Sequence, residues 1–137
     1  HYFDQCRFFR VVDNFMVQFG IAATPAVQKE WKSQILKDDP VVQTNKRGTI
    51  TYATSGKNTR TTQMFINTPE RGNGRLDKEG FAPFGEVIKG MEFVDAIQNK
   101  YKEKPVQGKI VNRGNAYLEE EFPDLSYIVT VRDVTQE

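Results

Sequence analysis

One charged side chain, Arg10, lies within a run of aromatic and β-branched residues. Residues 8–12 are Phe-Phe-Arg-Val-Val, and a second apolar run at 15–20 follows the turn-forming pair Asp13-Asn14. Removing a guanidinium from water among apolar neighbours is costly unless its N–H groups find partners. Arg10 therefore either points into solvent or is held in a site where its donors are useful.

The chain lacks the residues that most nucleophilic and metal-assisted chemistry requires. Its single histidine is His1, at the first position, and its single cysteine is Cys6. These counts exclude Ser-His and Cys-His catalysis, an internal disulfide and a cysteine-based or histidine-rich metal site. We expect no cofactor and no metal, and we expect Cys6 to be a buried small hydrophobic residue.

The charges of the chain are balanced, with 19 Lys and Arg against 18 Asp and Glu in 137 residues. This balance gives no electrostatic basis for binding nucleic acid or an anionic membrane. No apolar run approaches the roughly 18 residues of a membrane span. We expect one soluble domain over 1–137. Because the chain begins at His1 and not at Met, we expect it to be trimmed or processed, with an organellar or secretory location as one alternative.

Short runs of strand-forming residues alternate with polar turns along most of the chain. Strands are predicted over 6–12, 15–20, 49–54, 63–68, 81–88 and 126–134. A short helix is predicted over 26–36, with Thr24 as its N-cap and Trp31 as its packing anchor, and a second helix begins at Met91. Surface loops are predicted over 55–62 and 69–80, and irregular structure over 105–123. This arrangement favours an antiparallel barrel or sandwich.

Three blocks of the sequence together carry a recognisable signature. The first is Phe3-x-x-Cys6-x-Phe8-Phe9-Arg10-Val11-Val12-x-x-Phe15-Met16-x-Gln18-x-Gly20; the second is Gly48-Thr-Ile-x-x-Ala53-x-x-Gly56-x-Asn58-Thr59 with Gln63-Met-Phe65-Ile66; the third is Phe84-Gly85-x-Val87 with Gly90-Met91. In this order they closely resemble the cyclophilin-type peptidyl-prolyl isomerases. The resemblance spans nearly the whole chain.

The resemblance implies a mainly β fold, a closed antiparallel β-barrel with capping helices. Complete members have eight strands and two capping helices, and two strands and a helix precede the first block. That block begins here at Phe3. We therefore expect the N-terminal hairpin and first helix to be lacking in this chain. Either the native chain is longer, or a protein partner completes the sheet.

The resemblance also implies an enzyme that rotates X-Pro bonds in proline-containing peptides and unfolded proteins, with Arg10 as the catalytic residue. Rotation meets an amide barrier of ~20 kcal/mol, and a guanidinium aimed at the prolyl nitrogen stabilises the twisted form over the planar ones. The implied substrate-binding residues are Phe15, Met16, Gln18, Ala53, Thr54, Gln63, Phe65, Leu76 and Phe81. Taken without the resemblance, the same residues also fit a solvent-facing arginine, ordinary core aromatics and solvent-facing glutamines.

Some positions depart from the family pattern. Arg75 stands where the family has Trp, and Phe81 stands where its binding-site His usually lies. Both changes argue against tight binding of cyclosporin. The alternative function is a non-catalytic cyclophilin-like peptide-binding or structural subunit of a larger assembly. Retention of Arg10 favours the enzyme, whereas the missing N-terminal portion and the altered pocket rim favour the subunit.

Overall fold

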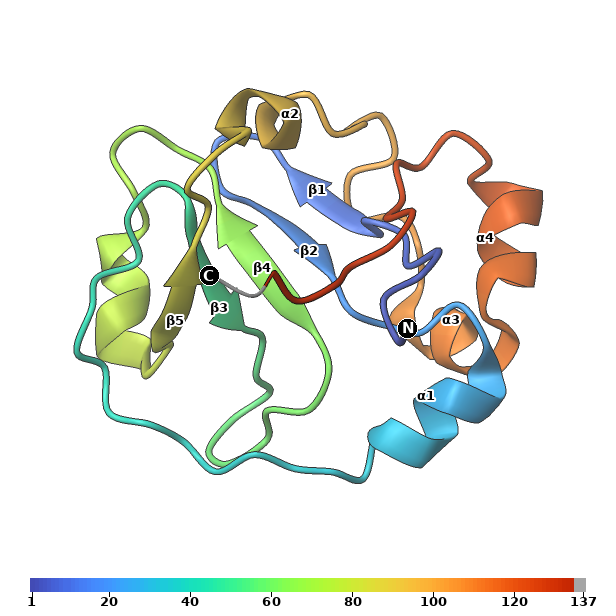
Figure 1. Ribbon diagram of the computed structural model, residues 1–137, viewed down its shortest axis with the longest axis horizontal. Helices are drawn as coiled ribbons and strands as arrows, with labels where there is room; N and C mark the ends of the chain where they lie inside the picture. The colour runs from blue at the N-terminus through green and yellow to red at the C-terminus, as the bar shows by residue number, and fades with distance from the viewer. Residues whose placement is uncertain (135–137) are drawn as a thin grey trace.

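The computed structural model describes residues 1–134. Its strands are β1 (Arg10–Val12), β2 (Met16–Phe19), β3 (Thr49–Tyr52), β4 (Met64–Asn67) and β5 (Pro83–Glu86). They form an antiparallel sheet in the order β1-β2-β4-β3-β5 (Figure 1). The helices are α1 (Pro25–Trp31), α2 (Met91–Asp95), α3 (Gln107–Arg113) and α4 (Asn115–Glu121), with a 3₁₀ helix, η1, over Gly74–Glu79. The mainly antiparallel β architecture is therefore confirmed, and closure into a barrel stays a prediction.

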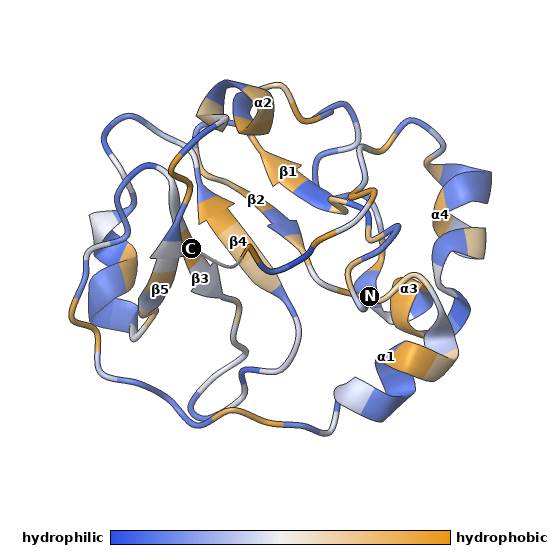
Figure 2. Cartoon of the chain, in the orientation of Figure 1, coloured by the Kyte–Doolittle hydropathy of each residue, from blue (hydrophilic) through white to orange (hydrophobic). Residues whose placement is uncertain are grey.

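The strand register gives the two faces of the sheet different characters. Arg10 pairs with Gln18 across β1 and β2, and Gln18 pairs with Phe65 across β2 and β4. Since side chains alternate between faces along a strand, these three residues share one face. The opposite face carries Val11, Val17 and Ile66, which are buried together beneath α2. Figure 2 shows hydrophobic residues along β1 and β4.

A second core lies beside the sheet, where α1, α3 and α4 gather (Figure 1). Its buried residues are Phe9, Ile21, Ile110, Tyr117, Leu118 and Leu125. Phe9 comes directly before β1, so the helical core is tied to the strand that carries Arg10. This connection positions one edge of the sheet.

The prediction of irregular structure over 105–123 is wrong. The segment forms α3 and α4, which bury Ile110, Tyr117 and Leu118. Gly114 separates the helices with φ +62° and ψ −149°, a conformation that is essentially restricted to glycine. Its interruption of the apolar spacing, together with the polar composition, hid the two helices in the sequence.

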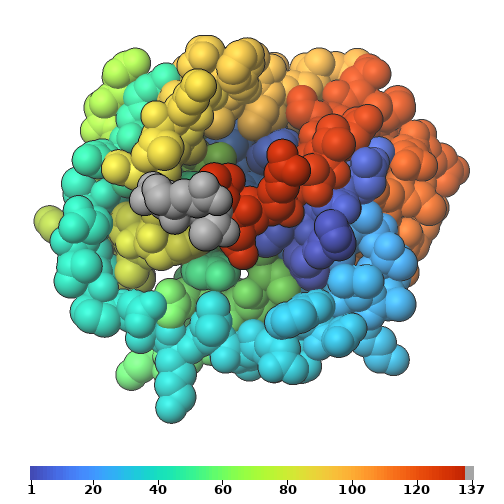
Figure 3. Space-filling view, viewed as in Figure 1, coloured from blue at the N-terminus to red at the C-terminus, as the bar shows by residue number. Residues whose placement is uncertain are grey.

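The prediction of a strand over 126–134 is also wrong. Residues 126–128 make an isolated bridge, between Tyr127 and Arg7, and three backbone hydrogen bonds to residues 5–8, but no strand forms, and Val129, Val131 and Val134 are exposed. Figure 3 shows it, in red, running over the surface of the molecule. Alternating valines favour a strand only where a neighbouring strand and a packing surface are present.

The first predicted helix is shorter than expected and its anchor differs. It ends at Trp31, which is 48% exposed and makes an edge-to-face contact with Tyr2, with ring centroids 6.4 Å apart. The buried residue of α1 is Gln28, and the side chain of Thr24 makes no capping hydrogen bond. The strands are likewise shorter than predicted, although five of the six predicted runs contain one.

A surface segment after α1 supports the loop between β3 and β4. Residues 32–40 are all exposed. The N–H of Leu36 donates to the carbonyl of Arg60 at 2.8 Å, and Asp38 and Asn58 exchange two hydrogen bonds. Arg60 is buried and binds the Lys37 carbonyl and Asp39. The loop predicted over 55–62 therefore contains a buried arginine, which its polar composition did not indicate.

Two negative findings concern the described part of the chain. Within residues 1–134 no helix combines the length and hydrophobicity that crossing a bilayer requires. Within the same residues, no group of three or more His, Cys, Asp or Glu side chains is arranged to hold a metal ion.

Gly114→Ala should destabilise the protein. A Cβ at this position would lie 2.4 Å from the Ala23 carbonyl oxygen, and the backbone conformation disfavours any side chain. We expect the free energy of unfolding, measured by urea denaturation, to fall by about 3 kcal/mol. Gly108→Ala is the matched control, because its Cβ meets nothing within 4 Å, and alanine there should be neutral or stabilising by up to ~1 kcal/mol. Equal stabilities for the two variants would contradict this account.

Candidate active site

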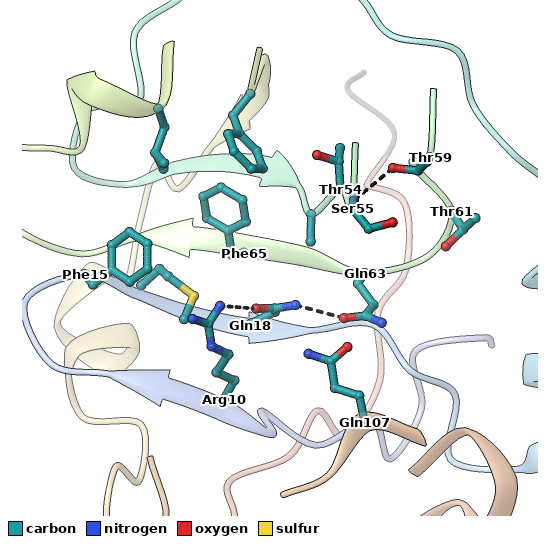
Figure 4. A pocket seen from close by; sticks show the side chains of 14 residues that line it. Arg10, Phe15, Gln18, Thr54, Ser55, Thr59, Thr61, Gln63, Phe65 and Gln107 are labelled. Atoms are coloured by element: carbon teal, nitrogen blue, oxygen red, sulfur yellow. Dashed lines mark hydrogen bonds between the residues drawn. The ribbon is translucent and has the colours of Figure 1, made fainter. Parts of the chain in front are cut away.

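A pocket of about 430 Å³ opens on the sheet face that carries Arg10 (Figure 4). The structure brings together around it all ten residues singled out from the sequence: Arg10, Phe15, Met16, Gln18, Ala53, Thr54, Gln63, Phe65, Leu76 and Phe81. Its other lining residues are Ser55, Thr59, Thr61 and Gln107. The strands supply one wall, the β3–β4 loop supplies the polar end, and η1 with Phe81 closes the apolar end.

A relay of hydrogen bonds crosses the pocket wall from Arg10. Its Nη1 donates to Gln18 Oε1 at 3.0 Å, and Gln18 Nε2 donates to Gln63 Oε1 at 2.8 Å (Figure 4). A guanidinium can only donate, so it sets the orientation of both amides in turn. The NH₂ group of Gln63 is then the end of the relay that can donate to a ligand. Gln18 is 5% exposed, which rules out the solvent-facing alternative for this residue.

The other end of the pocket is apolar. Met16, Phe65 and Leu76 are buried, and Phe15, Ala53 and Phe81 pack against them while remaining partly exposed. The rings of Phe65 and Phe81 meet edge to face with centroids 5.8 Å apart. These residues are both core and lining, so the two interpretations of their apolar character are compatible. The result is a slot shaped by side chains that are themselves fixed by packing.

Two guanidinium groups flank the aromatic ring at the rim. The central carbon of Arg10 lies 6.0 Å from the Phe15 centroid, and that of Arg75 lies 5.2 Å from it. Both distances allow a cation–π attraction. Arg75, which stands where the family pattern has tryptophan, therefore places a charged side chain against Phe15, one of the lining residues.

Buried asparagines hold η1 against the sheet. Asn67 donates from Nδ2 to Asn45 Oδ1 and to Thr49 Oγ1, and Thr51 Oγ1 donates to Asn45 Oδ1 at 2.8 Å. Asn73 Nδ2 donates to Asn67 Oδ1 at 2.7 Å and to the Phe15 carbonyl at 2.8 Å. Buried polar groups with satisfied partners rigidify their surroundings. This network fixes the segment that carries Leu76 into the pocket.

Asp77 is the charged end of this network. Its Oδ2 accepts from Thr44 Oγ1 at 2.6 Å, and its Oδ1 accepts from Asn45 N at 2.9 Å and Asn45 Nδ2 at 2.7 Å. Desolvation raises the Asp77 pKa, but these hydrogen bonds outweigh it and hold the pKa below its usual value. The carboxylate form is thus part of the folded arrangement at neutral pH.

Cys6 lies outside the pocket and is fully buried, as expected. Burial raises the pKa of its thiol to about 11, and Sγ faces the Ile21 carbonyl oxygen at 3.3 Å. At neutral pH the group is a thiol and not a nucleophilic thiolate.

The family model for the cyclophilin type peptidyl-prolyl cis-trans isomerase/CLD matches residues 1–115. The chain belongs to the cyclophilin family. It is 36% identical over 102 residues to a peptidyl-prolyl cis-trans isomerase of Acinetobacter baylyi, covering 72% of this chain and 54% of that protein. It is 39% identical over 94 residues to peptidyl-prolyl cis-trans isomerase A of Dickeya dadantii, covering 66% and 49%. The chain thus spans about half the length of these curated relatives.

The fold of this cyclophilin is also similar to solved structures. The crystal structure of a cyclophilin type peptidyl-prolyl cis-trans isomerase from Cryptosporidium parvum superposes with a TM-score of 0.56 at 22% identity. The match covers 69% of this chain and 60% of that one. At this identity the similarity concerns the architecture alone.

Sequence reasoning missed several residues that shape the cyclophilin pocket. Gln107 was missed because its segment was predicted to be irregular, and Figure 4 shows it reaching from α3 toward Gln63. The asparagine network was missed too. One signal was available, because Thr49 and Thr51 alternate with Ile50, so they had to lie on the face opposite the apolar core.

Asp77→Asn should remove part of the acid sensitivity of the fold. The lowered pKa means that the unfolded chain takes up this proton at higher pH, so stability falls as pH drops below about 4, the usual Asp range. Urea midpoints between pH 7 and pH 2.5 should show a flatter acid limb for the variant and a loss of about 1–2 kcal/mol at pH 7. Lys78→Ala, next to it on η1, should follow the wild type. An unchanged acid limb in Asp77→Asn would refute the role of these hydrogen bonds.

Proposed function

We propose that this cyclophilin catalyses cis–trans rotation about X-Pro bonds in extended peptides and unfolded proteins. The observation that carries the proposal is the guanidinium of Arg10 beside an apolar slot lined by Met16, Phe65 and Leu76, with Gln18 holding one of its nitrogens. Family membership and the similarity to peptidyl-prolyl cis-trans isomerases support the same activity.

The chemistry asks little of the protein beyond position and charge. Resonance gives the amide a rotation barrier of ~20 kcal/mol. In the twisted transition state the prolyl nitrogen becomes pyramidal and regains its lone pair. A donor from Arg10 aimed at that nitrogen stabilises the twisted form more than either planar form, and this differential binding lowers the barrier. The reaction uses no nucleophile, redox group or proton transfer.

The substrate would be held by two different surfaces. The slot around Phe65 receives the proline ring and keeps it still while the preceding residue turns. Ala53 donates its N–H to the Gln63 carbonyl at 3.0 Å, so this segment is tied to the strand beside it. Its carbonyl and the backbone of Thr54 are then the groups that would pair with an extended peptide. The NH₂ of Gln63 would bind a peptide carbonyl.

We also propose that residues 1–137 form one cyclophilin-type domain. The family match ends at residue 115, yet Tyr117, Leu118 and Leu125 belong to the same core as Phe9 and Ile21. This shared core supports a single unit. A protein partner that completes the sheet remains a prediction, as does the alternative function as a non-catalytic peptide-binding subunit. Retention of Arg10, together with its relay, favours the enzyme.

Arg10→Ala should abolish most of the activity while leaving the fold intact. We expect kcat/KM for an X-Pro peptide, measured by NMR exchange spectroscopy, to fall by about 100-fold or more. Arg10→Lys should also be impaired, because it keeps the charge but lacks the planar fork. Arg113→Ala is the control, since that side chain is paired with Glu120 outside the pocket.

Circular dichroism of the Arg10 variants should match the wild type. Equal rates for wild type and Arg10→Ala would defeat the catalytic assignment. A wild-type chain that binds proline peptides, seen as shifts of the pocket resonances, but does not exchange their isomers would instead support the non-catalytic subunit.

We expect cyclosporin to inhibit the isomerase weakly. Arg75 places a charge where the family pattern has tryptophan, and Phe81 takes the place of the usual histidine. Arg75→Trp should strengthen inhibition by about tenfold by adding apolar surface at the rim, as measured by an inhibition titration. Arg71→Trp controls for non-specific apolar gain, because Arg71 is an exposed residue of the preceding loop that donates to the Asn14 carbonyl instead of stacking on Phe15. Tight inhibition of the wild type would contradict the expectation.

A further inference from the structure

The guanidinium of Arg10 has a second partner on the side away from Gln18. Nε donates to Glu103 Oε1 at 2.8 Å, and Nη2 donates to the same oxygen at 2.6 Å. Glu103 lies between α2 and α3, far from Arg10 in the sequence. Amide rotation does not require a carboxylate as a reacting group, so Glu103 would act on the reaction through Arg10.

The contact with Glu103 leaves two N–H groups of the Arg10 guanidinium available for a substrate. A guanidinium has five N–H groups. Glu103 takes the one on Nε and one on Nη2, and Gln18 takes one on Nη1. One N–H therefore stays available on each of Nη1 and Nη2. The two acceptors of the twisted bond, its carbonyl oxygen and its prolyl nitrogen, match that number.

The segment that carries Glu103 is attached to its surroundings on both sides. The N–H of Val11 donates to the carbonyl of Lys102 at 3.2 Å, which ties the residue before Glu103 to the strand residue after Arg10. Further along, the N–H of Val106 donates to Tyr117 Oη at 3.1 Å, and Pro105 is buried. Glu103 is thus presented by an anchored backbone.

The solvent exposure of the Arg10–Glu103 ion pair indicates that it orients the guanidinium and does not mainly stabilise the fold. The side chain of Glu103 is 57% exposed and that of Arg10 is 33% exposed. An ion pair this accessible contributes little to folding, because water and salt screen it. Two hydrogen bonds to one oxygen nevertheless fix the plane of the guanidinium, and an orientation error of this kind reduces the rate.

We propose that Glu103 is a positioning residue that grips the outer edge of the Arg10 guanidinium and directs its two remaining N–H groups at the substrate amide. The proposal rests on the proposed isomerase function. Removing the carboxylate leaves Arg10 charged but held by Gln18 alone, through one N–H, so the chemical step suffers and peptide binding does not.

The kinetic test compares Glu103→Ala and Glu103→Gln with Glu119→Ala. Glu119 is exposed to a similar degree as Glu103, forms an ion pair with Arg7 at 3.2 Å, and does not line the pocket. We expect Glu103→Ala to lose about tenfold in kcat with KM within about twofold, since small misplacements of a catalytic group act on the rate. Glu103→Gln should be intermediate, because its amide oxygen still accepts hydrogen bonds without the charge. Glu119→Ala should match the wild type.

A second readout does not depend on catalysis. The Arg10 Nε–H resonance, assigned in a ¹⁵N spectrum by its loss in Arg10→Lys, should exchange slowly with water in the wild type and in Glu119→Ala. It should exchange quickly in Glu103→Ala.

The kinetic and exchange measurements together distinguish failure of the Glu103 positioning role from failure of the proposed isomerase function. A Glu103→Ala protein as active as the wild type, or more active, overturns the positioning role even if the isomerase function holds. A rapidly exchanging wild-type resonance also overturns it. An inactive wild type with a protected resonance overturns the isomerase function, and the role of Glu103 with it, while leaving the ion pair intact. If Glu103→Ala fails to fold, Glu103→Gln decides by the same criteria.

Discussion

A cation at the edge of an apolar pocket needs acceptors on every side that does not face the ligand, and the rest of this site follows from that need. Arginine cannot accept a hydrogen bond, so Gln18 has to turn its oxygen toward it. Gln18 must then present its NH₂ to Gln63, and Gln63 is left with an NH₂ of its own. The direction of the hydrogen bonds along the pocket wall is therefore set by Arg10, which can only donate.

The start of β1 makes this arrangement possible, because three successive residues there lie in three different parts of the structure. Phe9 is buried in the helical core, Arg10 faces the pocket, and Val11 is buried in the core beneath α2. Packing on two sides thus holds the backbone of the residue between them. A flexible arginine stem is given a fixed origin by neighbours that never touch the ligand.

Most of the strands and many of the pocket residues could be predicted from the sequence. The elements that were predicted wrongly have physical explanations. Strands β1 to β5 follow from local runs of strand-forming residues, and ten of the lining residues follow from the resemblance to the cyclophilin family. The helices after Pro105 did not, because Gly114 breaks their apolar periodicity and their burial depends on Phe9 and Ile21 far away in the chain. For the segment after Leu125 the error was the reverse, because a strand was predicted where the structure has none. Its valines have strand propensity, yet residues 129 and 131 find no partner strand.

Contacts between distant segments were the least accessible information. Glu103 and Gln107 lie in a polar stretch with no local pattern, and only the fold brings them to the arginine and its relay. The buried asparagines illustrate the same limit, since a polar residue in sequence gives no sign that it is enclosed. Asn45 and Asn67 are fully buried here and join three separate segments.

The exposed segment 32–40 braces the β3–β4 loop from outside, through Leu36, Asp38 and the carbonyl of Lys37. That loop carries Thr59 and Thr61 into the pocket lining. The polar end of the pocket is therefore supported by a segment of chain that contributes no residue to a hydrophobic core cluster. Cleavage of the chain within 32–40 would remove these supports of the loop without breaking any pairing among strands β1 to β5, because the segment belongs to none of these strands.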